Sequence, residues 1–579
     1  MSFAKAFQRA SQEQGQNMGV PEIIETDPQL VPHMYRAQVQ PRCSLQFAGD
    51  RTHRDIWIEQ WVNPREEDGK PTYQYPETQN VLEEGYFCRF RVKFPYRLFS
   101  NCGQDSIFRP MLGKNGIPFI PGSGVKGVFL RYCKKSDRAL AIRYCGDKEP
   151  LTQGILRFHG AYPVGDWAGT AVKEEKNYYR IVDVVHPQEK RQIGIEEKST
   201  SAFALISFYQ PELVFEISST ELLSQEEWRN ISGKLKSALV QGLGGKTSTG
   251  YGLPFITKNQ YDINLSLHGV GITPVLLSGE PEFRPNVFKA TLRGHAKRLL
   301  GGCCQNQQDN QRVEKKIGEL FGNTQAPGKV EIYWELRNPS SNTDWQPTYD
   351  IRGNLHISAP NADVNFIKYL IKFAYTMGGF GKSWRRVWHK NFYHQNLRYD
   401  KLIGCHWECK DSGWKNDISE WVDDIRTPEQ LDNFLKNLEN ECKKYFQVKE
   451  PQSLNWREAW YKKRVAVYSK PVSQSQVIEL FHKRIYKQTQ AIGGRKTIIR
   501  QKNGREEETE VLVVSSVWHR MLPIEGNKYL EIVTVFHGDR TPNSPWQHRT
   551  EGDQLQPFIQ NLENAQLKLT WGTRPVFNT

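Results

Sequence analysis

Hydrophobic and polar residues alternate along the chain in stretches that predict strands separated by helices. Residues 90–99 have the period of two that is typical of a strand, and a helix is expected from Val125, directly after the turn Gly122-Ser123-Gly124. A second helical pattern, residues 225–243, ends in a stretch rich in glycine. Such strand–helix–strand units predict an α+β fold whose sheets carry helices on one face, as in ferredoxin-like and RNA-recognition-motif-like domains.

The same order of elements occurs a second time further along the chain. The first copy has a helix, a corner at Gly146, a strand and the glycine-rich residues 242–252. The second copy has a helix at residues 289–300, a corner at Gly322, a strand and the glycine-rich residues 377–386. This repeat predicts two tandem units with insertions. The expected boundaries are a flexible or docking arm at residues 1–42, a first unit at residues 43–260, and a second, divergent unit at residues 261–579.

The last third of the chain is expected to extend the second unit. Residues 427–445 have the pattern of an amphipathic helix, and residues 482–505 are strongly basic and end in an Asn-Gly turn. Residues 508–520 and 529–538 alternate like strands. We expect residues 529–538 to complete the second sheet, with the helix and a basic β-hairpin as extensions.

Charge and composition indicate what kind of molecule the protein binds and in which compartment it works. Lys and Arg outnumber Asp and Glu by 14, which favours a polyanionic partner without naming it. The N-terminal residues lack the apolar core of a signal peptide, and no apolar run reaches membrane-spanning length, so we expect a cytoplasmic protein that does not use a membrane. Ten cysteines in 579 residues are too few for a disulfide framework. The C-x3-C spacing of Cys405 and Cys409 leaves a structural zinc site open.

Two glycine-rich segments have the chemistry of phosphate-binding loops. The turn at Gly122-Ser123-Gly124 precedes a helix, whose first N–H groups can point at an anion, and Lys126 and Arg131 add positive charge. Residues 241–254 hold too many glycines for a packed helix or strand, so the backbone there is expected to adopt positive φ or to approach another group closely. Both segments favour binding of a polyanion.

These segments resemble motifs of one protein family. Residues 118–127, PFIPGSGVKG, resemble the PyIPGSSlKG signature of the RAMP (repeat-associated mysterious protein) superfamily. Residues 242–252, GLGGKTSTGYG, resemble the C-terminal glycine-rich loop of the same superfamily, and His186-Pro187 suggests its Cmr-type branch. The resemblance implies tandem ferredoxin-like RAMP domains and a place in the RNA-binding backbone of a type III CRISPR effector complex. The implied partners are guide RNA, complementary target RNA, a large polymerase-like subunit, further RAMP subunits and small subunits.

The residues expected to contact RNA come from the turn, from the glycine-rich loops of both units and from the basic helix of the second unit. They are Gly122, Ser123, Gly124, Lys126, Arg131, Gly244, Gly245, Lys246, Thr247, Ser248, Tyr251, Arg284, Lys289, Arg293, Lys297, Gly379, Gly381, Lys382, Ser383, Arg385 and Arg386.

Asp105 is the candidate catalytic residue. It precedes the phosphate-binding turn and resembles in position the aspartate that RAMP backbone subunits require for cutting target RNA. The resemblance implies attack of a ribose 2′-OH on the adjacent phosphate, assisted by a divalent metal ion, Mg or Mn. The second unit has no matching aspartate, and Glu280 or Glu282 is its substitute candidate, so we expect that unit to bind RNA without cutting it.

Three other functions compete with this one. A non-catalytic scaffold would bind the same RNA with Asp105 in a structural role. A stand-alone endoribonuclease that processes CRISPR transcripts would use His159 or His186 as a general base. An ATPase is improbable, because Val240 stands where a Walker A motif needs its first glycine and a helical pattern precedes the loop.

Overall fold

The computed structural model describes most of the chain from Leu82 onward. The described residues are 82–100, 110–112, 118–149, 151–173, 176–185, 203–254, 261–276, 281–306, 308–323, 326, 328–342, 348–393, 402–410, 414–449, 451, 458–502, 505–538, 544–548 and 550–577. The expected arm at residues 1–42, together with Asp105, His186 and Glu280, lies outside these ranges.

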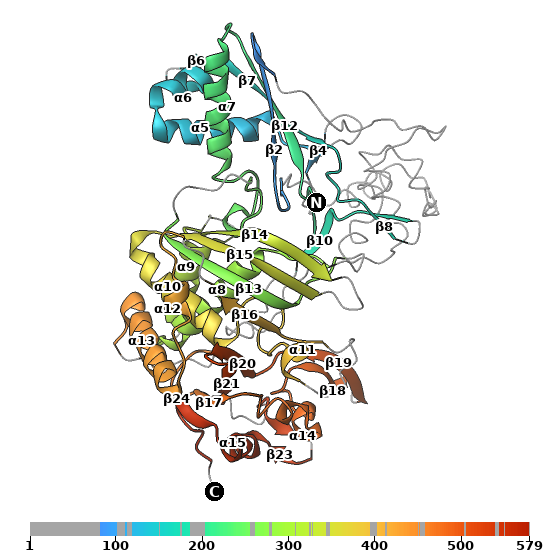
Figure 1. Cartoon of the computed structure of the whole chain (residues 1–579), viewed down its shortest axis with the longest axis vertical. Coiled ribbons are helices and arrows are strands. Elements are labelled where there is room, and N and C mark those ends of the chain that lie inside the picture. Colours follow the sequence, from blue (N-terminus) through green and yellow to red (C-terminus); the bar gives the residue numbers. More distant parts are fainter. Residues whose placement is uncertain are drawn as a thin grey trace, which may run out of the picture.

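The first unit is built on a four-stranded antiparallel sheet in the order β1-β2-β12-β7. Three helices lie on one face of this sheet (Figure 1). The strands of the sheet are β1 (Leu82–Glu84), β2 (Phe87–Lys93), β7 (Leu156–Val164) and β12 (Glu212–Ser219), and the helices are α5 (Gly122–Ser136), α6 (Arg138–Cys145) and α7 (Gln225–Leu239). Four two-stranded sheets accompany it: β3 (Met111–Leu112) with β4 (Pro118–Phe119), β5 (Gly146–Lys148) with β6 (Leu151–Gln153), β8 (Ala171–Lys173) with β9 (Lys176–Tyr178), and β10 (Val182–Val185) with β11 (Phe203–Ile206).

The second unit has the complete ferredoxin-like connection. Its sheet order β14-β15-β13-β16 is 2-3-1-4 in chain order, with every pair antiparallel. The elements are β13 (Ile263–Ile272), α8 (Asn286–Gly302), α9 (Gln308–Phe321), β14 (Glu331–Asn342), β15 (Thr348–Ser358), α10 (Asn361–Met377) and β16 (Cys405–Cys409). The predicted α+β, ferredoxin-like fold is therefore confirmed.

A third sheet, in the order β20-β21-β17-β24, follows the same 2-3-1-4 arrangement. Its elements are β17 (Val465–Val472), β20 (Val517–Ile524), β21 (Lys528–Phe536), α15 (Leu555–Asn564) and β24 (Lys568–Gly572). The expectation that residues 529–538 complete the second sheet is wrong, since β21 pairs with β17 and β20 and the fourth strand of the second sheet is β16. We call the part around this third sheet, residues 458–577, the third layer.

The remaining elements connect or extend the sheets. α13 (Pro428–Phe446) confirms the amphipathic helix expected near residues 427–445, and its capping box joins Thr427 with Gln430. The others are η5 (Thr247–Thr249), α11 (His389–Phe392), α12 (Ser419–Val422), η7 (Leu480–His482), α14 (Arg484–Gln488), the hairpin β18 (Gly494–Lys502) with β19 (Arg505–Val513), and the short pair β22 (Gln547–His548) with β23 (Gly552–Asp553).

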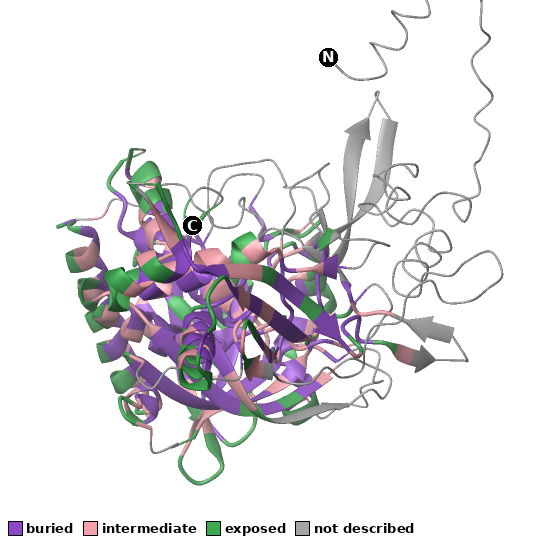
Figure 2. Cartoon of the chain, turned by 90° about the horizontal axis from the view of Figure 1, so that it is seen from above, coloured by how far each residue is buried: buried purple, intermediate pink, exposed green. Residues whose placement is uncertain are grey.

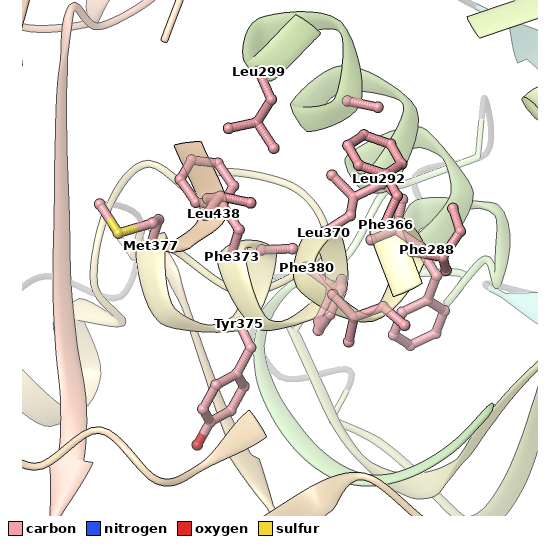
Figure 3. Packing of buried hydrophobic residues seen from close by; sticks show 14 of the residues in the cluster. Phe288, Leu292, Leu299, Phe366, Leu370, Phe373, Tyr375, Met377, Phe380 and Leu438 are labelled. Carbon is pink, nitrogen blue, oxygen red and sulfur yellow. The ribbon is translucent and has the colours of Figure 1, made fainter. Parts of the chain in front are cut away.

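The largest hydrophobic core lies between the second sheet and its helices, and it extends into the third layer. Side chains of α8 and α10 pack against one another there, as Figure 3 shows for Phe288, Leu292, Phe366 and Phe373. Seen from above, buried residues run through the strands and the inner faces of the helices, and exposed residues lie on the outer turns (Figure 2). The first unit has a separate core between its sheet and α5, α6 and α7.

A buried charge cluster connects the second unit to the third layer. Glu458 is fully buried and accepts from Arg298 of α8 at 2.6 Å and from Arg385, which follows α10, at 2.9 Å. A buried carboxylate is stable only when such partners compensate its lost hydration. Glu458 therefore fixes the position of Arg385, and with it the end of the second glycine-rich segment.

Candidate nucleic-acid interface

The turn at Gly122-Ser123-Gly124 forms the first residues of α5, and its two glycines have different surroundings. A Cβ on Gly122 would lie 1.9 Å from the carbonyl oxygen of Phe158, so this glycine lets the helix approach β7. The nearest atom to a Cβ on Gly124 is 3.9 Å away, and both Gly124 and Ser123 are exposed. Gly122 thus has a packing role, whereas Ser123 and Gly124 are accessible to a ligand.

Basic side chains accompany this turn. Lys126 lies half-buried one turn into α5, and Arg131 is exposed further along the same helix. Gly122, Ser123 and Lys126 line a hollow of about 390 Å³ whose other side includes Arg157 of β7. Cations beside a helix N-terminus favour an anion at this end of α5.

The glycine-rich loop after α7 folds back onto the chain that leaves β2. Gly245 N donates to Phe99 O at 2.6 Å, and Gly252 N donates to Arg97 O at 3.0 Å. Gly244 has φ +79°, and a Cβ there would lie 2.2 Å from Phe99 O, so the loop needs glycine at this position. Because β1 already occupies the sheet edge beside β2, the segment after α7 does not enter the sheet and is available as a loop.

Lys246 stands at the tip of this loop. Its backbone is left-handed, with φ 59°, immediately before η5. The side chain is exposed, and its ammonium lies 4.8 Å from the centre of the Phe99 ring. Lys246 therefore places a cation at the surface next to backbone groups of Gly244 and Gly245.

The loop and the second unit enclose a cleft of about 710 Å³, which we call the inter-unit cleft. Residues 244–249 line one side, and Lys289 of α8, Asn323 after α9 and Tyr333 of β14 line the other. Lys289 Nζ contacts Ser248 Oγ across the cleft. Arg293, one turn further along α8, donates to Gly322 O at 2.5 Å and holds the corner between α9 and β14.

Lys289 is a buried cation, with 9% of its surface exposed. Burial and, after it, the nearby charge of Arg293 together lower its pKa to about 8. An anion in the cleft would favour the protonated form of Lys289. The cleft is therefore suited to a phosphate group.

Comparison with known proteins agrees with the two motifs. Residues 110–255 match the sequence profile of the RAMP superfamily, and this range contains the turn, the helix after it and the glycine-rich loop. We therefore call the first unit, which contains this range, the RAMP unit. No curated protein matches the chain. A matching solved structure is the crystal structure of Cmr1 from Pyrococcus furiosus in its apo form, with 14% sequence identity, a TM-score of 0.35, and coverage of 53% of this chain and 98% of that one.

The structure brings together only part of the expected RNA-binding set. Six of those residues line the inter-unit cleft: Gly244, Gly245, Lys246, Thr247, Ser248 and Lys289. The turn of the RAMP unit lines a separate hollow. Asn323 and Tyr333 were not predicted, because they are distant in sequence from the loop and only the packing of the two units places them in the cleft.

Several residues expected to contact RNA have internal contacts. Tyr251 is 2% exposed and packs edge-on against Phe99, 5.0 Å between ring centres. Arg284 Nε donates to Glu282 at 2.7 Å, and Lys297 forms an ion pair with Glu314 of α9. These three side chains have internal partners, and their contacts with RNA stay predictions.

The second glycine-rich segment packs against the third layer. Arg385 pairs with Glu458, and Arg386 donates to Val517 O and to Ser515 Oγ, both at 2.8 Å. Gly379 is buried with φ +87°, and a Cβ there would lie 2.5 Å from the Trp407 ring. Gly381 and Ser383 are half-buried with positive φ, and Lys382 is exposed. Gly379, Arg385 and Arg386 thus have internal contacts, whereas Lys382 is exposed, and the RNA contacts expected from all four stay predictions.

Of the acidic residues proposed for catalysis, the structure describes Glu282 but not Asp105. Asp105 lies outside the described residues. Glu282 is 9% exposed and divides its two oxygens between Arg97 and Arg284, each at 2.7 Å. A carboxylate held by two guanidinium groups in this way is an ion-pair partner, so Glu282 is not a substitute for the catalytic aspartate.

The described residues contain no cluster of side chains that could bind a metal ion. No group of three or more His, Cys, Asp or Glu side chains there could hold a metal ion. Cys405 and Cys409 lie on β16, and Cys405 Sγ contacts Gly378 O at 3.6 Å. Among the described helices, none is long and apolar enough to span a membrane.

Proposed function

We propose that this chain is a guide-RNA-binding backbone subunit of a type III CRISPR ribonucleoprotein. The observation that carries the proposal is the RAMP match over residues 110–255, which includes both the helix turn and the glycine-rich loop with the exposed Lys246. The net charge of +14 supports a polyanionic partner. The other subunits of the complex and the target RNA are further parts of this proposal.

The guide RNA backbone would pass along the inter-unit cleft. Lys246 and Lys289 would neutralise phosphates, and the backbone N–H groups of residues 244–249 would donate to phosphate oxygens. Lys126, Arg131 and Lys382 would extend the same backbone contact outside the cleft. Contacts of this kind are not specific for sequence, as a subunit that accepts many guides requires.

Target RNA would be cut at the RAMP unit through Asp105. The carboxylate would position the reacting 2′-OH, and a divalent ion, Mg²⁺ or Mn²⁺, would stabilise negative charge. The described residues offer no complete ligand set for that ion, so we derive no step from it. His159, the candidate general base of a processing endoribonuclease that lies within the described residues, bonds Ser218 Oγ at 2.7 Å.

Cleavage of a guide-complementary RNA by the assembled complex tests this function. Wild-type protein and Asp105→Asn are compared with Mg²⁺ or Mn²⁺ present, and a gel shift measures binding in parallel. We expect Asp105→Asn to lose one specific cut while it retains binding. Unchanged cutting would leave the chain a scaffold, and cutting of precursor RNA by the isolated protein would favour a processing enzyme.

A further inference from the structure

The sheet of the RAMP unit has a second face, opposite to α5, α6 and α7 (Figure 1). The strand pairing places side chains of β2, β12 and β7 side by side on this face, because Phe87 lies opposite Ser218, and Arg91 and Tyr162 both lie opposite Val214. We call it the open sheet face, and define it by Phe87, Arg89, Arg91, Lys93, His159 and Tyr162.

Aromatic rings on this face are exposed to an unusual degree. Phe87 is 48% exposed and Tyr162 is 38% exposed, whereas apolar rings on a sheet are normally covered. Phe87 stacks on His159 with ring centres 6.2 Å apart, and Tyr162 stacks on Phe119 of β4 with ring centres 5.4 Å apart and planes 9° apart. The hydrogen bond between His159 Nε2 and Ser218 Oγ, 2.7 Å long, fixes the first pair. In each pair, the stacked partner holds the exposed ring in a fixed orientation.

Cations follow Phe87 along the same strand, β2. Arg89, Arg91 and Lys93 are alternate residues of β2, so they are spaced about 6.6 Å apart along one face of the strand. Arg89 Nη2 lies 2.5 Å from Glu216 of β12, which orients the guanidinium along the sheet, and Lys93 is exposed. Arg91 Nη1 likewise lies 3.8 Å from Glu212 of β12, so two carboxylates partly neutralise this row of three cations beside the aromatic rings.

We propose that the open sheet face binds a single-stranded segment of RNA, with bases stacked on Phe87 and Tyr162 and the backbone along Arg89, Arg91 and Lys93. Exposed rings beside cations match the two parts of a nucleotide, an apolar base and an anionic phosphate. The inference rests on the proposed function, since it assumes that the chain is an RNA-binding subunit. It names the bound form as single-stranded, because a base inside a duplex has no free face to stack.

Fluorescence anisotropy of the full-length protein with a labelled ten-nucleotide oligouridine RNA tests the inference. We expect Phe87→Ala and Tyr162→Ala each to weaken binding on the order of tenfold to a hundredfold. Both side chains are exposed, so the variants keep the wild-type melting temperature. Leu222→Ala, which removes another exposed apolar side chain of this unit, is the matched control and is expected to bind like wild type.

Two further measurements separate this inference from the proposed function. Lys246→Ala, in the inter-unit cleft, tests RNA binding away from the open sheet face, and a ten-base-pair duplex tests the preference for single strands. Wild-type affinity in Phe87→Ala and Tyr162→Ala, with weaker binding in Lys246→Ala, would overturn the inference alone. No RNA binding by wild-type protein would overturn both, and equal loss of duplex binding in the ring variants would also contradict stacking.

Discussion

Lys289 of α8 contacts Ser248 in the glycine-rich loop, so a cation of the second unit lies against the loop of the first unit. The contact lies in the inter-unit cleft. The loop supplies backbone groups and Lys246, and the second unit supplies the buried charge.

RNA affinity is expected to depend on the protonation of Lys289. Its pKa is lowered to about 8 by burial and by Arg293, so the side chain loses its charge as pH rises from 7 to 9. Wild-type affinity should fall severalfold over that range at constant salt. Lys289→Met should bind more weakly at pH 7 and lose this pH dependence, whereas Lys246→Ala should retain it. An identical pH profile in Lys289→Met and wild type would contradict a role for Lys289 in binding.

The two glycines of the helix turn should respond differently to alanine. Gly122→Ala places a Cβ 1.9 Å from Phe158 O, and we expect a loss of about 3 kcal/mol in unfolding free energy. Gly124→Ala meets no atom closer than 3.9 Å and should be neutral or stabilising by up to about 1 kcal/mol. Thermal unfolding of both variants measures the difference. Equal melting temperatures would show that α5 does not need to approach β7 so closely.

The buried cluster at Glu458 should be essential for the third layer. Glu458→Gln leaves Arg298 and Arg385 without their carboxylate, and we expect a loss of about 3–5 kcal/mol. Glu563→Gln is the matched control, since its ion pair with Arg574 lies at the surface and should contribute less than about 1 kcal/mol. Differential scanning fluorimetry compares them, and a Glu458→Gln protein as stable as the control would be evidence against the cluster.

Acid should lower the stability of the protein through the histidine pair that connects α11 and η7. His389 Nε2 and His482 Nε2 lie 3.2 Å apart, and burial lowers the pKa of each imidazole to about 4. Between the usual histidine pKa and about 4 the unfolded chain binds protons that the folded chain does not, so stability falls as pH falls through that range. His482→Gln should therefore lose less melting temperature between pH 7 and pH 5 than wild type does. The same loss in both would contradict this prediction.

Local patterns in the sequence were sufficient for the fold class and for the loops. The turn at residues 122–124 and the glycines of residues 242–252 are visible because helix starts and positive-φ positions have local signatures. The third sheet has no such signature. Its central strand β17 pairs with β24, almost a hundred residues later, and only the folded chain brings them together.

Burial explains why the site was only partly predicted. Lys382, Arg385 and Arg386 look alike in the sequence, but Lys382 is exposed whereas the arginines bind Glu458, Ser515 and Val517. Their partners lie more than seventy residues away, so no local pattern distinguishes a surface cation from one that joins two units. Tyr251 shows the same limit for an aromatic ring, since it belongs to the core.

The salt dependence of RNA binding tests the central claim most directly. Affinity for a labelled single-stranded RNA is measured between about 50 and about 200 mM salt for wild type, Lys246→Ala and the control Lys528→Ala, an exposed lysine in the third layer. We expect wild-type affinity to fall on the order of a thousandfold, and the slope of Lys246→Ala to be smaller by about one. A slope near zero for wild type, or equal slopes for wild type and Lys246→Ala, would contradict RNA binding in the inter-unit cleft.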